Sequence, residues 1–472
     1  MLGMSRAIRA DHSQQFLLPP SLDDWLAREH PARFVRDVVE TLDLAKLGFR
    51  QSPGEDGRPH YAPELLLGVW LFGWMERTRS SRSLEKACLR DVAYLWLTGN
   101  HHPDHNTLWR FFRDNKKALR NVFRRTVRIA ADAGLVGFAL HAIDGTKLQS
   151  ASSTETALHR QQLKDALKKL DSAVDKGMAE IEAREEQEDA SYAMPEEMRD
   201  SEVRRAAIRK ALAVLEENEA DHLHPREADA RVMKLAGGTH RLGYNAQVAV
   251  DHESDLIVCE QVTTDAADSG MLVPMIQEIL DNFERVAETT VADKGYWAGA
   301  QLADAKLRQF DVAVPPQDRV SGPYTKDQFA YDAPSNFYTC PRGERLPLAK
   351  TLRASEHYPV AVYGCKNASC PVRNECTTSK VGRIVKRTVF DDVLAEHAEA
   401  MKKPRNAIAI ELRKEIVEHA FGAIKWNDGF RRFTAFGVDG ASGQWALVCT
   451  ATNLRKLHAA YRTGRLKLTP RR

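Results

Sequence analysis

Residues 137–150 read GFALHAIDGTKLQS, an apolar run that ends in Asp144. Such a run is typical of a buried strand that carries a carboxylate at its end. A second strand pattern, TTVADKGYW over residues 289–297, places Asp293 in the same way. A third acid, Glu418, lies within the helical pattern RKEIVEHAFGAIKW of residues 413–426. We therefore expect two strands and a late helix of an α/β core to bring three carboxylates together.

Three carboxylates from distant parts of a chain suit a pair of divalent cations. Mg²⁺ and Mn²⁺ are hard cations that prefer oxygen ligands. Two such ions ~3.5–4 Å apart can activate a nucleophile and stabilise the leaving oxygen of a phosphodiester. Asp144, Asp293 and Glu418 are thus predicted to be catalytic metal ligands. Taken singly, Asp144 and Asp293 could stabilise turns, and Glu418 could pair with Lys414 on its helix.

Five segments resemble, in this order, the DDE transposases of bacterial insertion sequences, within the IS4/IS5-like superfamily. They are HAIDGTKL (141–148), GYNAQVAVD (243–251), VADKGYW (291–297), VEHAFGAIK (417–425) and WALVCTATNLRKL (445–457). The resemblance runs from about Leu18 to about His458. It implies a ribonuclease H-like catalytic core, two Mg²⁺ (or Mn²⁺) ions, and cutting and joining of transposon ends by transesterification. Its partners would be double-stranded DNA, as terminal inverted repeats and target, and further copies of the chain in a homo-oligomer.

Two other classes of protein share parts of this pattern. A domesticated DNA-binding protein would keep the fold and lose catalysis, but Asp144, Asp293 and Glu418 are all intact. A ribonuclease H-like nuclease would cut DNA without joining it. The long helical segment that precedes Asp144 is more than such a nuclease needs.

The family signature around the glutamate is Tyr, Arg, Glu and Lys at spacings Y-x2-R-x3-E-x6-K. The lysine position is Lys425, the arginine position holds Lys414 with Arg413 beside it, and the tyrosine position holds Glu411. The resemblance implies that Lys425, and Lys414 or Arg413, contact DNA phosphates near the cut. The alternative is a set of helix-surface cations.

Two aromatic residues, Tyr296 and Trp297, closely follow Asp293. Trp297 is predicted to stack on an unpaired base near the transposon end, a contact typical of single-strand binding. The competing interpretation is a core aromatic beneath the site.

The composition of the 472 residues is that of a globular protein, with 43% hydrophobic and 28% charged residues. No apolar run approaches the ~20 residues that a membrane span needs, and no signal-peptide core is visible. These features predict a cytoplasmic, nucleoid-associated protein with no membrane partner. The net charge is only +3, so its distribution is more informative.

Basic residues cluster in Arg110–Arg128 and again in Arg455–Arg472. Such clusters neutralise phosphates and release counterions, although many are simply solvated surfaces. We predict that Arg113, Arg120 and Arg124 bind DNA, within a helix-turn-helix-like head whose alternative is a plain helical bundle.

Changes in composition predict three domains. Residues 1–132 form the helical DNA-binding domain, residues 133–458 the catalytic domain, and residues 459–472 a basic tail. The catalytic domain carries two insertions: a helical hairpin at 154–232, broken near Ser191–Pro195, and a Cys-rich segment at 335–385.

Four of the seven cysteines fall in or beside this second insertion: Cys340, Cys365, Cys370 and Cys376. Four cysteines so close together in a cytoplasmic protein favour structural Zn²⁺ over disulfides. Their intervals are not the CxxC pairs of a zinc ribbon, so free thiols in a compact insertion are the alternative.

Overall fold

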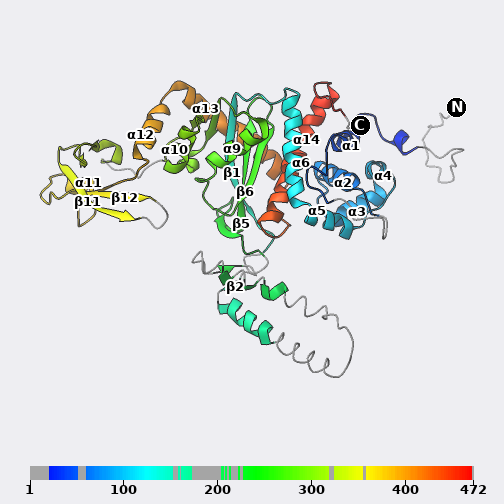
Figure 1. The fold of residues 1–472 in the computed structure, drawn as a ribbon, viewed down its shortest axis with the longest axis horizontal. Helices are drawn as coiled ribbons and strands as arrows, with labels where there is room; N and C mark the ends of the chain where they lie inside the picture. Colours follow the sequence, from blue (N-terminus) through cyan, green and yellow to red (C-terminus); the bar gives the residue numbers. More distant parts are fainter. Residues whose placement is uncertain are drawn as a thin grey trace, which may run out of the picture. The chain divides into compact units, whose positions relative to one another are not determined.

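The computed structural model describes residues 21–50, 60–152, 158–159, 161–172, 203–206, 208–209, 212–213, 222–223, 227–317, 324–353 and 358–469. Its contacts divide the chain into two compact units. Met1–Ala133 and Ala446–Arg472 form one, the helical unit, and Gly134–Trp445 forms the other, the sheet unit. Figure 1 labels their elements.

Local sequence signals set the starts of several helices in the helical unit. Pro31 and Pro63 each occupy a first helical turn, because their missing N–H would have no partner there. Asp104 caps the fifth helix and accepts the N–H of Thr107. The helices are α1 (Pro31–Glu40), α2 (Pro63–Met75), α3 (Ser81–Arg90), α4 (Val92–Thr98), α5 (His105–Asp114) and α6 (Lys116–Asp132).

The basic segment Arg110–Arg128, predicted as one helix, spans two. Asn115 separates α5 from α6 and is buried at the break. Its side chain donates to the carbonyl of Phe111 (2.8 Å) and accepts the N–H of Arg50 (3.0 Å). These bonds satisfy backbone groups left open where a helix ends. The apolar spacing continues across the break, so the sequence pattern does not reveal it.

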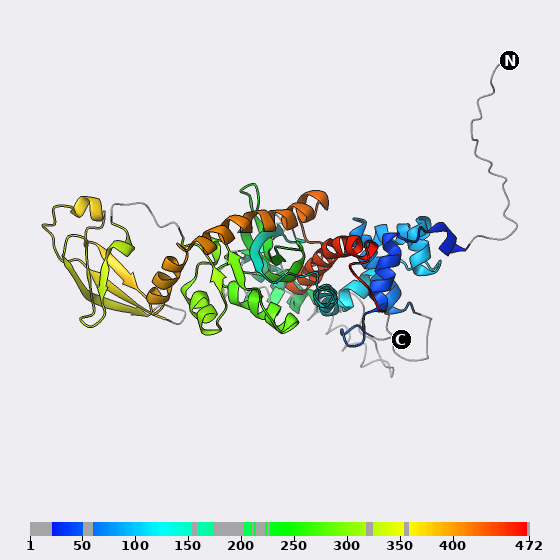
Figure 2. The ribbon, with the colours of Figure 1, turned by 90° about the horizontal axis from the view of Figure 1, so that it is seen from above.

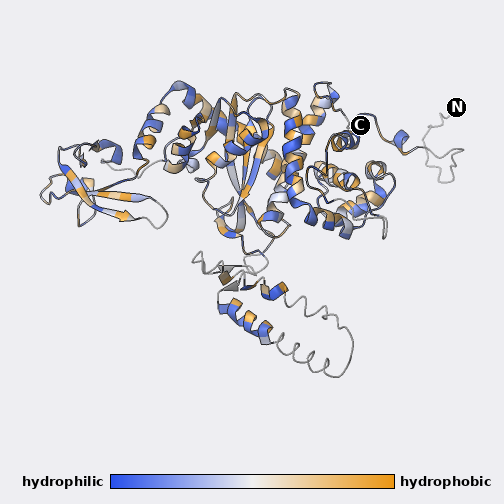
Figure 3. Cartoon of the chain, viewed as in Figure 1, coloured by the Kyte–Doolittle hydropathy of each residue, from blue (hydrophilic) through white to orange (hydrophobic). Residues whose placement is uncertain are grey.

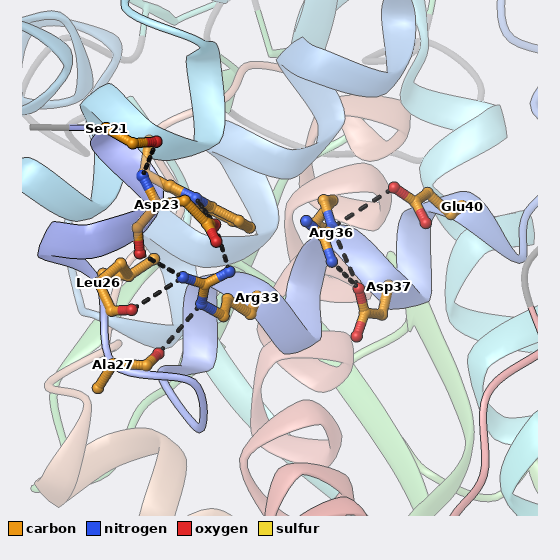
Figure 4. Close-up of polar contacts among 9 residues, drawn as sticks. Ser21, Asp23, Leu26, Ala27, Arg33, Arg36, Asp37 and Glu40 are labelled. Atoms are coloured by element: carbon orange, nitrogen blue, oxygen red, sulfur yellow. Dashed lines mark hydrogen bonds and ion pairs between the residues drawn. The ribbon is translucent and has the colours of Figure 1, made fainter.

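Arg33 on α1 fixes the connection from the preceding 3-10 turn, η1 (Leu22–Trp25), as Figure 4 shows. Its guanidinium donates to the carboxylate of Asp23 at 2.5 Å. It also donates to the carbonyls of Asp23, Leu26 and Ala27 at 2.8–3.1 Å. One side chain thus satisfies three carbonyl groups that have no helical partner.

The C-terminal part of α14 (Val438–Arg462) belongs to the helical unit. Arg455 donates to the carbonyls of Trp74 and Met75, at the C-terminal end of α2, at 2.9–3.0 Å. The hydroxyl of Tyr461 donates to Asp37 on α1 at 2.7 Å. The predicted boundary between the catalytic domain and the basic tail, at residue 458, therefore falls inside α14. Arg455, the first cation of the basic cluster Arg455–Arg472, packs against α2.

The sheet unit is built on six strands. Its main path runs β4-β5-β1-β7-β8, and β6 also pairs with β5. β5 is antiparallel to β1, β4 and β6, whereas β1, β7 and β8 are parallel. The strands are β1 (Leu140–Gln149), β4 (Arg231–Lys234), β5 (His240–Asp251), β6 (Ile257–Thr263), β7 (Thr289–Ala292) and β8 (Val312–Ala313). β5 and β6 form an antiparallel hairpin whose turn contains His252–Asp255.

Helices cover both faces of this mainly apolar sheet. Figure 2 shows α13 (Pro404–Gly422) on one face and α9 (Leu272–Phe283) with α10 (Gly299–Leu307) on the other. Figure 3 shows the hydrophobic colouring of the strands. Trp445 at the start of α14 is fully buried and donates its indole N–H to the carbonyl of Gln247 on β5 (3.0 Å). The core is thus a mixed α/β layer structure.

The predicted helical hairpin of residues 154–232 is described only in part. A helical segment at residues 161–172 packs Leu163, Leu167 and Leu170 in a cluster with Ile208 and Leu212. Leu163, Leu167 and Leu170 recur at steps of four and three residues, the spacing of one helix face, so this packing agrees with a helical segment. Short strands β2 (Leu158–His159) and β3 (His222–Leu223) pair at its base. The predicted break near Ser191–Pro195 lies outside the described residues.

The Cys-rich insertion is an antiparallel sheet of five strands with one short helix. The aromatic residues Tyr338 and Tyr363 and the aliphatic Leu346 are in its core. Between this sheet and α13 lies α12 (Asp391–Ala400). The elements of the insertion are β9 (Ala330–Asp332), β10 (Phe337–Thr339), β11 (Arg345–Arg353), β12 (Pro359–Gly364), α11 (Arg373–Cys376) and β13 (Ile384–Arg387).

Candidate active site

Asp144 and Asp293 are carried by adjacent parallel strands. Ile143 on β1 is in register with Ala292 on β7, and the two acids are the next residues along each strand. Burial raises the pKa of Asp144, and the nearby Asp293 carboxylate adds to that rise, against the opposing effects of Arg413 and the N–H of Gly145. The predicted pair of acids therefore shares one electrostatic environment.

Two cations, one on α13 and one in the segment that follows it, interact electrostatically with Asp144. The guanidinium of Arg413 lies 3.1 Å from the carboxylate of Asp144, and both side chains are largely buried. Lys425 lies in η5 (Ala423–Asn427), a π-helical segment that continues α13. Burial lowers the pKa of Lys425, and the attraction of Asp144 opposes that change. π-helical turns often mark functional sites, because they shift the side chains that follow.

Glu418 lies on the exposed side of α13. Its side chain is 65% exposed, and its nearest cation is Lys414, one turn earlier, at 3.9 Å. The buried face of the helix instead presents Ile416, Val417 and Ala420. Within the described ranges, no three His, Cys, Asp or Glu residues are grouped so as to hold a metal ion. Convergence of Glu418 with the two aspartates stays a prediction.

Tyr296 is fully buried and is the core aromatic beneath the acids. Its hydroxyl donates to the side-chain oxygen of Gln247. Burial, followed by the charges of Asp268, Asp144 and Asp293, raises its pKa. Trp297, the predicted stacking residue, is half-buried, with its ring 5.5 Å from that of His397 on α12.

Trp426, which sequence reasoning missed, is a strongly exposed aromatic residue beside Lys425. Its side chain is 75% exposed, and the guanidinium of Arg431 lies 4.3 Å from its ring centroid. Arg431 also donates to the carbonyl of Lys425 at 3.3 Å. A large apolar ring left in solvent is a candidate ligand contact. The sequence signal that could have identified Trp426 is its position directly after Lys425, the lysine of the family signature.

The four clustered cysteines are free thiols and do not form the expected zinc centre. Cys340, Cys365 and Cys376 pack against the aromatic core of the insertion. Burial raises the pKa of Cys376, and the other three thiols add to that rise, against the opposing effect of Arg383. No zinc-binding group is present in the part of the chain that the structure describes.

The three arginines predicted to bind DNA differ in exposure. Arg113 is exposed and hydrogen-bonds to Asp114 at 2.7 Å, whereas Arg120 and Arg124 are half-buried on α6. Arg110, Lys117 and Arg125 are the exposed cations of the same two helices. No helix in the described ranges is both long and apolar enough to cross a membrane.

Two protein families match this chain. The family described as "Transposase DDE domain" matches residues 339–458, which include Glu418 and Lys425. The family described as "Transposase domain (DUF772)" matches residues 20–114, which are the helices up to α5. A search of curated proteins gave no match.

Among solved structures, the chain is similar to one titled "Cryo-EM structure of piggyBac transposase synaptic complex with hairpin DNA (SNHP)". The identity is 9% over 93% of this chain and 77% of that one, with a TM-score of 0.32, which is too low to establish a shared fold. The two family matches define the class: the chain is a transposase. It belongs to the DDE transposases of the insertion-sequence type, enzymes that cleave DNA.

Proposed function

We propose that this transposase cuts and joins DNA at the ends of an insertion sequence, at a divalent-metal site built from Asp144, Asp293 and Glu418. The observation that carries the proposal is the register of β1 with β7, which places Asp144, within β1, next to Asp293, the residue that follows β7. The order of the sheet, three antiparallel strands followed by two parallel ones, supports a ribonuclease H-like core.

The residues at this site fit a divalent cation. Two carboxylates whose charges disfavour each other supply hard oxygen ligands, and a bound cation would relieve their repulsion. Asp144 and Asp293 would hold the metal, with Glu418 as the third ligand from α13. Bound Mg²⁺ or Mn²⁺ would activate the attacking oxygen and stabilise the leaving one. Cys340, Cys365 and Cys376 pack against the core of the separate five-stranded sheet, and the proposal gives the cysteines no role at this site.

The protein's own cations and aromatic rings would hold the substrate. Lys425 is attracted by the charge of Asp144 and would bind a phosphate beside the scissile bond, while Arg413 balances the charge of the acid pair. Lys414 is exposed and would reach the DNA backbone further away. Trp426 would stack on an unpaired base at the cut end, a role that its exposure favours over Trp297.

Recognition of duplex DNA is assigned to the helical unit. Its exposed cations Arg110, Arg113, Lys117 and Arg125 carry the phosphate contacts in this proposal, with Arg120 and Arg124 supporting them. The substrates are terminal inverted repeats and a target duplex. A homo-oligomer would bring two ends together in the cytoplasm, at the nucleoid.

A strand-transfer assay tests the proposal. Purified protein is incubated with a duplex that carries the terminal repeat and with a supercoiled target, with Mg²⁺, with Mn²⁺ or with EDTA. We expect cleaved ends joined to target with either metal and no product with EDTA. Cleavage without joining would assign a nuclease, and joining in EDTA would exclude the metal site.

A further inference from the structure

Asp268, in the loop between β6 and α9, is the centre of a polar network in the sheet unit. Its carboxylate accepts hydrogen bonds from Lys147 at 2.6 Å, Asn245 at 2.7 Å and Gln247 at 2.8 Å. Only 18% of its side chain is exposed. Three donors on one largely buried carboxylate form a charge-assisted network, which is geometrically specific.

The network connects the two strands that carry the catalytic acids. Lys147 lies on β1, three residues after Asp144. Gln247 bonds to Asp268 through its amide nitrogen, and its oxygen accepts the hydroxyl of Tyr296. Tyr296 closes η3 (Lys294–Tyr296), the 3-10 turn that Asp293 caps through the N–H of Gly295 at 2.7 Å. One chain of bonds thus runs from the Asp144 strand to the Asp293 turn.

Two glycines leave room for this network. A Cβ on Gly145, directly after Asp144, would lie 2.6 Å from a carboxylate oxygen of Asp268 and would also meet the amide of Gln247. A Cβ on Gly295 would lie 2.8 Å from the carboxylate of Asp293. A larger residue at position 145 would displace the carboxylate of Asp268, and one at position 295 would displace that of Asp293.

We propose that Asp268 is a positioning residue, which sets the separation and orientation of Asp144 and Asp293 for a divalent cation. This inference rests on the proposed metal site. Asp268 itself accepts hydrogen bonds from the ammonium of Lys147 and from two amides, so the proposal assigns it to orienting the ligands and not to binding the cation. Residues that orient metal ligands in this way typically change metal affinity ~10–100-fold when replaced.

The test is Mn²⁺ binding by the full-length protein without DNA, measured by calorimetric titration. Asp268→Asn should weaken Mn²⁺ binding by ~10–100-fold at a temperature where circular dichroism shows the variant folded. The matched control is Asp265→Asn, which removes the same charge from an exposed side chain in the same loop. The control should bind Mn²⁺ like the wild type.

Asp144→Asn separates this inference from the proposed function. If Asp144→Asn binds Mn²⁺ as tightly as the wild type, the proposed metal site itself is wrong. If Asp144→Asn loses binding while Asp268→Asn keeps wild-type affinity, only the positioning role is overturned. Complete loss of binding in Asp268→Asn would also overturn it, because Asp268 would then be a ligand.

If Asp268→Asn does not fold, a milder variant tests whether the network positions the two acids. Tyr296→Phe keeps the buried ring and removes only the hydroxyl that links Gln247 to the Asp293 turn. We expect a smaller loss of Mn²⁺ affinity in the same direction. Unchanged affinity in Tyr296→Phe would contradict a network that controls the acids.

Discussion

Lys425 and Lys414 are neighbouring lysines of one helical segment with opposite environments. Lys425 is half-buried and is attracted by the charge of Asp144, whereas Lys414 is 76% exposed and lies beside Glu418. A cation fixed near developing negative charge contributes more to catalysis than one in solvent, because its field is less screened. The two residues therefore form a matched pair for mutation.

We expect Lys425→Met to reduce the rate of strand cleavage about 100-fold, the effect typical of removing one fixed electrostatic contact. Lys414→Met should change that rate by less than about 5-fold, because exposed ion pairs contribute ~0–1 kcal/mol. Single-turnover cleavage at saturating protein measures both. Equal effects of the two substitutions would refute the assignment of Lys425 to the reacting phosphate.

Trp426 gives a second prediction at the residue scale. Trp426→Ala should weaken binding to a pre-cut end with an unpaired terminal base, since stacking contributes ~1–3 kcal/mol per base. Binding to fully paired duplex should change little. Trp25, 51% exposed in the helical unit, supplies the control substitution. A Trp426→Ala protein that binds both DNAs like the wild type would leave this ring without a role in DNA binding.

The sequence predicted that Asp144 and Asp293 would each end an apolar strand. Asp293 directly follows β7, but Asp144 lies within β1, which continues to Gln149, so its expected place at a strand end was wrong. The sequence did not predict the contact of Arg413 with Asp144, because that depends on how far α13 rotates over the sheet. The sequence offered Asp268 only as a loop residue close to the site; its hydrogen-bond partners were not predicted, since a loop residue has no periodicity.

At the scale of elements, Asp251 joins the end of β5 to the start of β1. Its carboxylate accepts the N–H groups of Gly137 and Phe138 at 3.2 Å and two bonds from Ser254 at 2.6–2.9 Å. His141 lies 3.6 Å away. Burial alone would raise the pKa of Asp251, but these contacts outweigh it and the pKa is lowered.

Asp251→Asn should therefore lower the free energy of unfolding by ~1.5–3 kcal/mol at pH 7, the range for hydrogen bonds to a charged group. A folded-state pKa below the unfolded value of ~3.9 stabilises the protein above that pH and loses this effect as the pH falls. Urea unfolding at pH 7 and pH 3 should show that the variant and the wild type differ less in free energy of unfolding at pH 3. A difference that widens at pH 3 would contradict the sign.

Arg455 is the corresponding link in the helical unit. Its guanidinium caps the last carbonyls of α2, where the helix dipole also favours a cation. Arg455→Ala should lower the free energy of unfolding by ~1–3 kcal/mol and leave the salt dependence of DNA binding unchanged. If DNA binding by Arg455→Ala depended less on salt than that of the wild type, Arg455 would be a DNA contact and not only a packing residue.

Element starts were easier to predict than element ends. Pro31 and Pro63 mark helix starts through their own covalent geometry. The end of α5 depends on the buried side-chain bonds of Asn115, and the role of Arg455 depends on packing against α2. Both are tertiary contacts that no local pattern encodes.

At the scale of the whole molecule, binding and chemistry are assigned to different units. Replacing the exposed cations Arg110, Lys117 and Arg125 by Ala should weaken binding to terminal-repeat DNA. The slope of log K against log salt should fall by ~0.9 for each phosphate that the variant no longer neutralises. Gel-shift titrations across salt concentrations measure it. An unchanged slope would make α5 and α6 elements of a helical bundle.

Asp144→Asn tests the central claim most directly. The substitution removes one proposed metal ligand from the sheet unit and leaves every cation of the helical unit in place. The same labelled terminal-repeat duplex is used for gel shift and for nicking with Mn²⁺. We predict no detectable nicking together with wild-type binding affinity and salt slope. Nicking by Asp144→Asn at the wild-type rate would contradict the proposed active site.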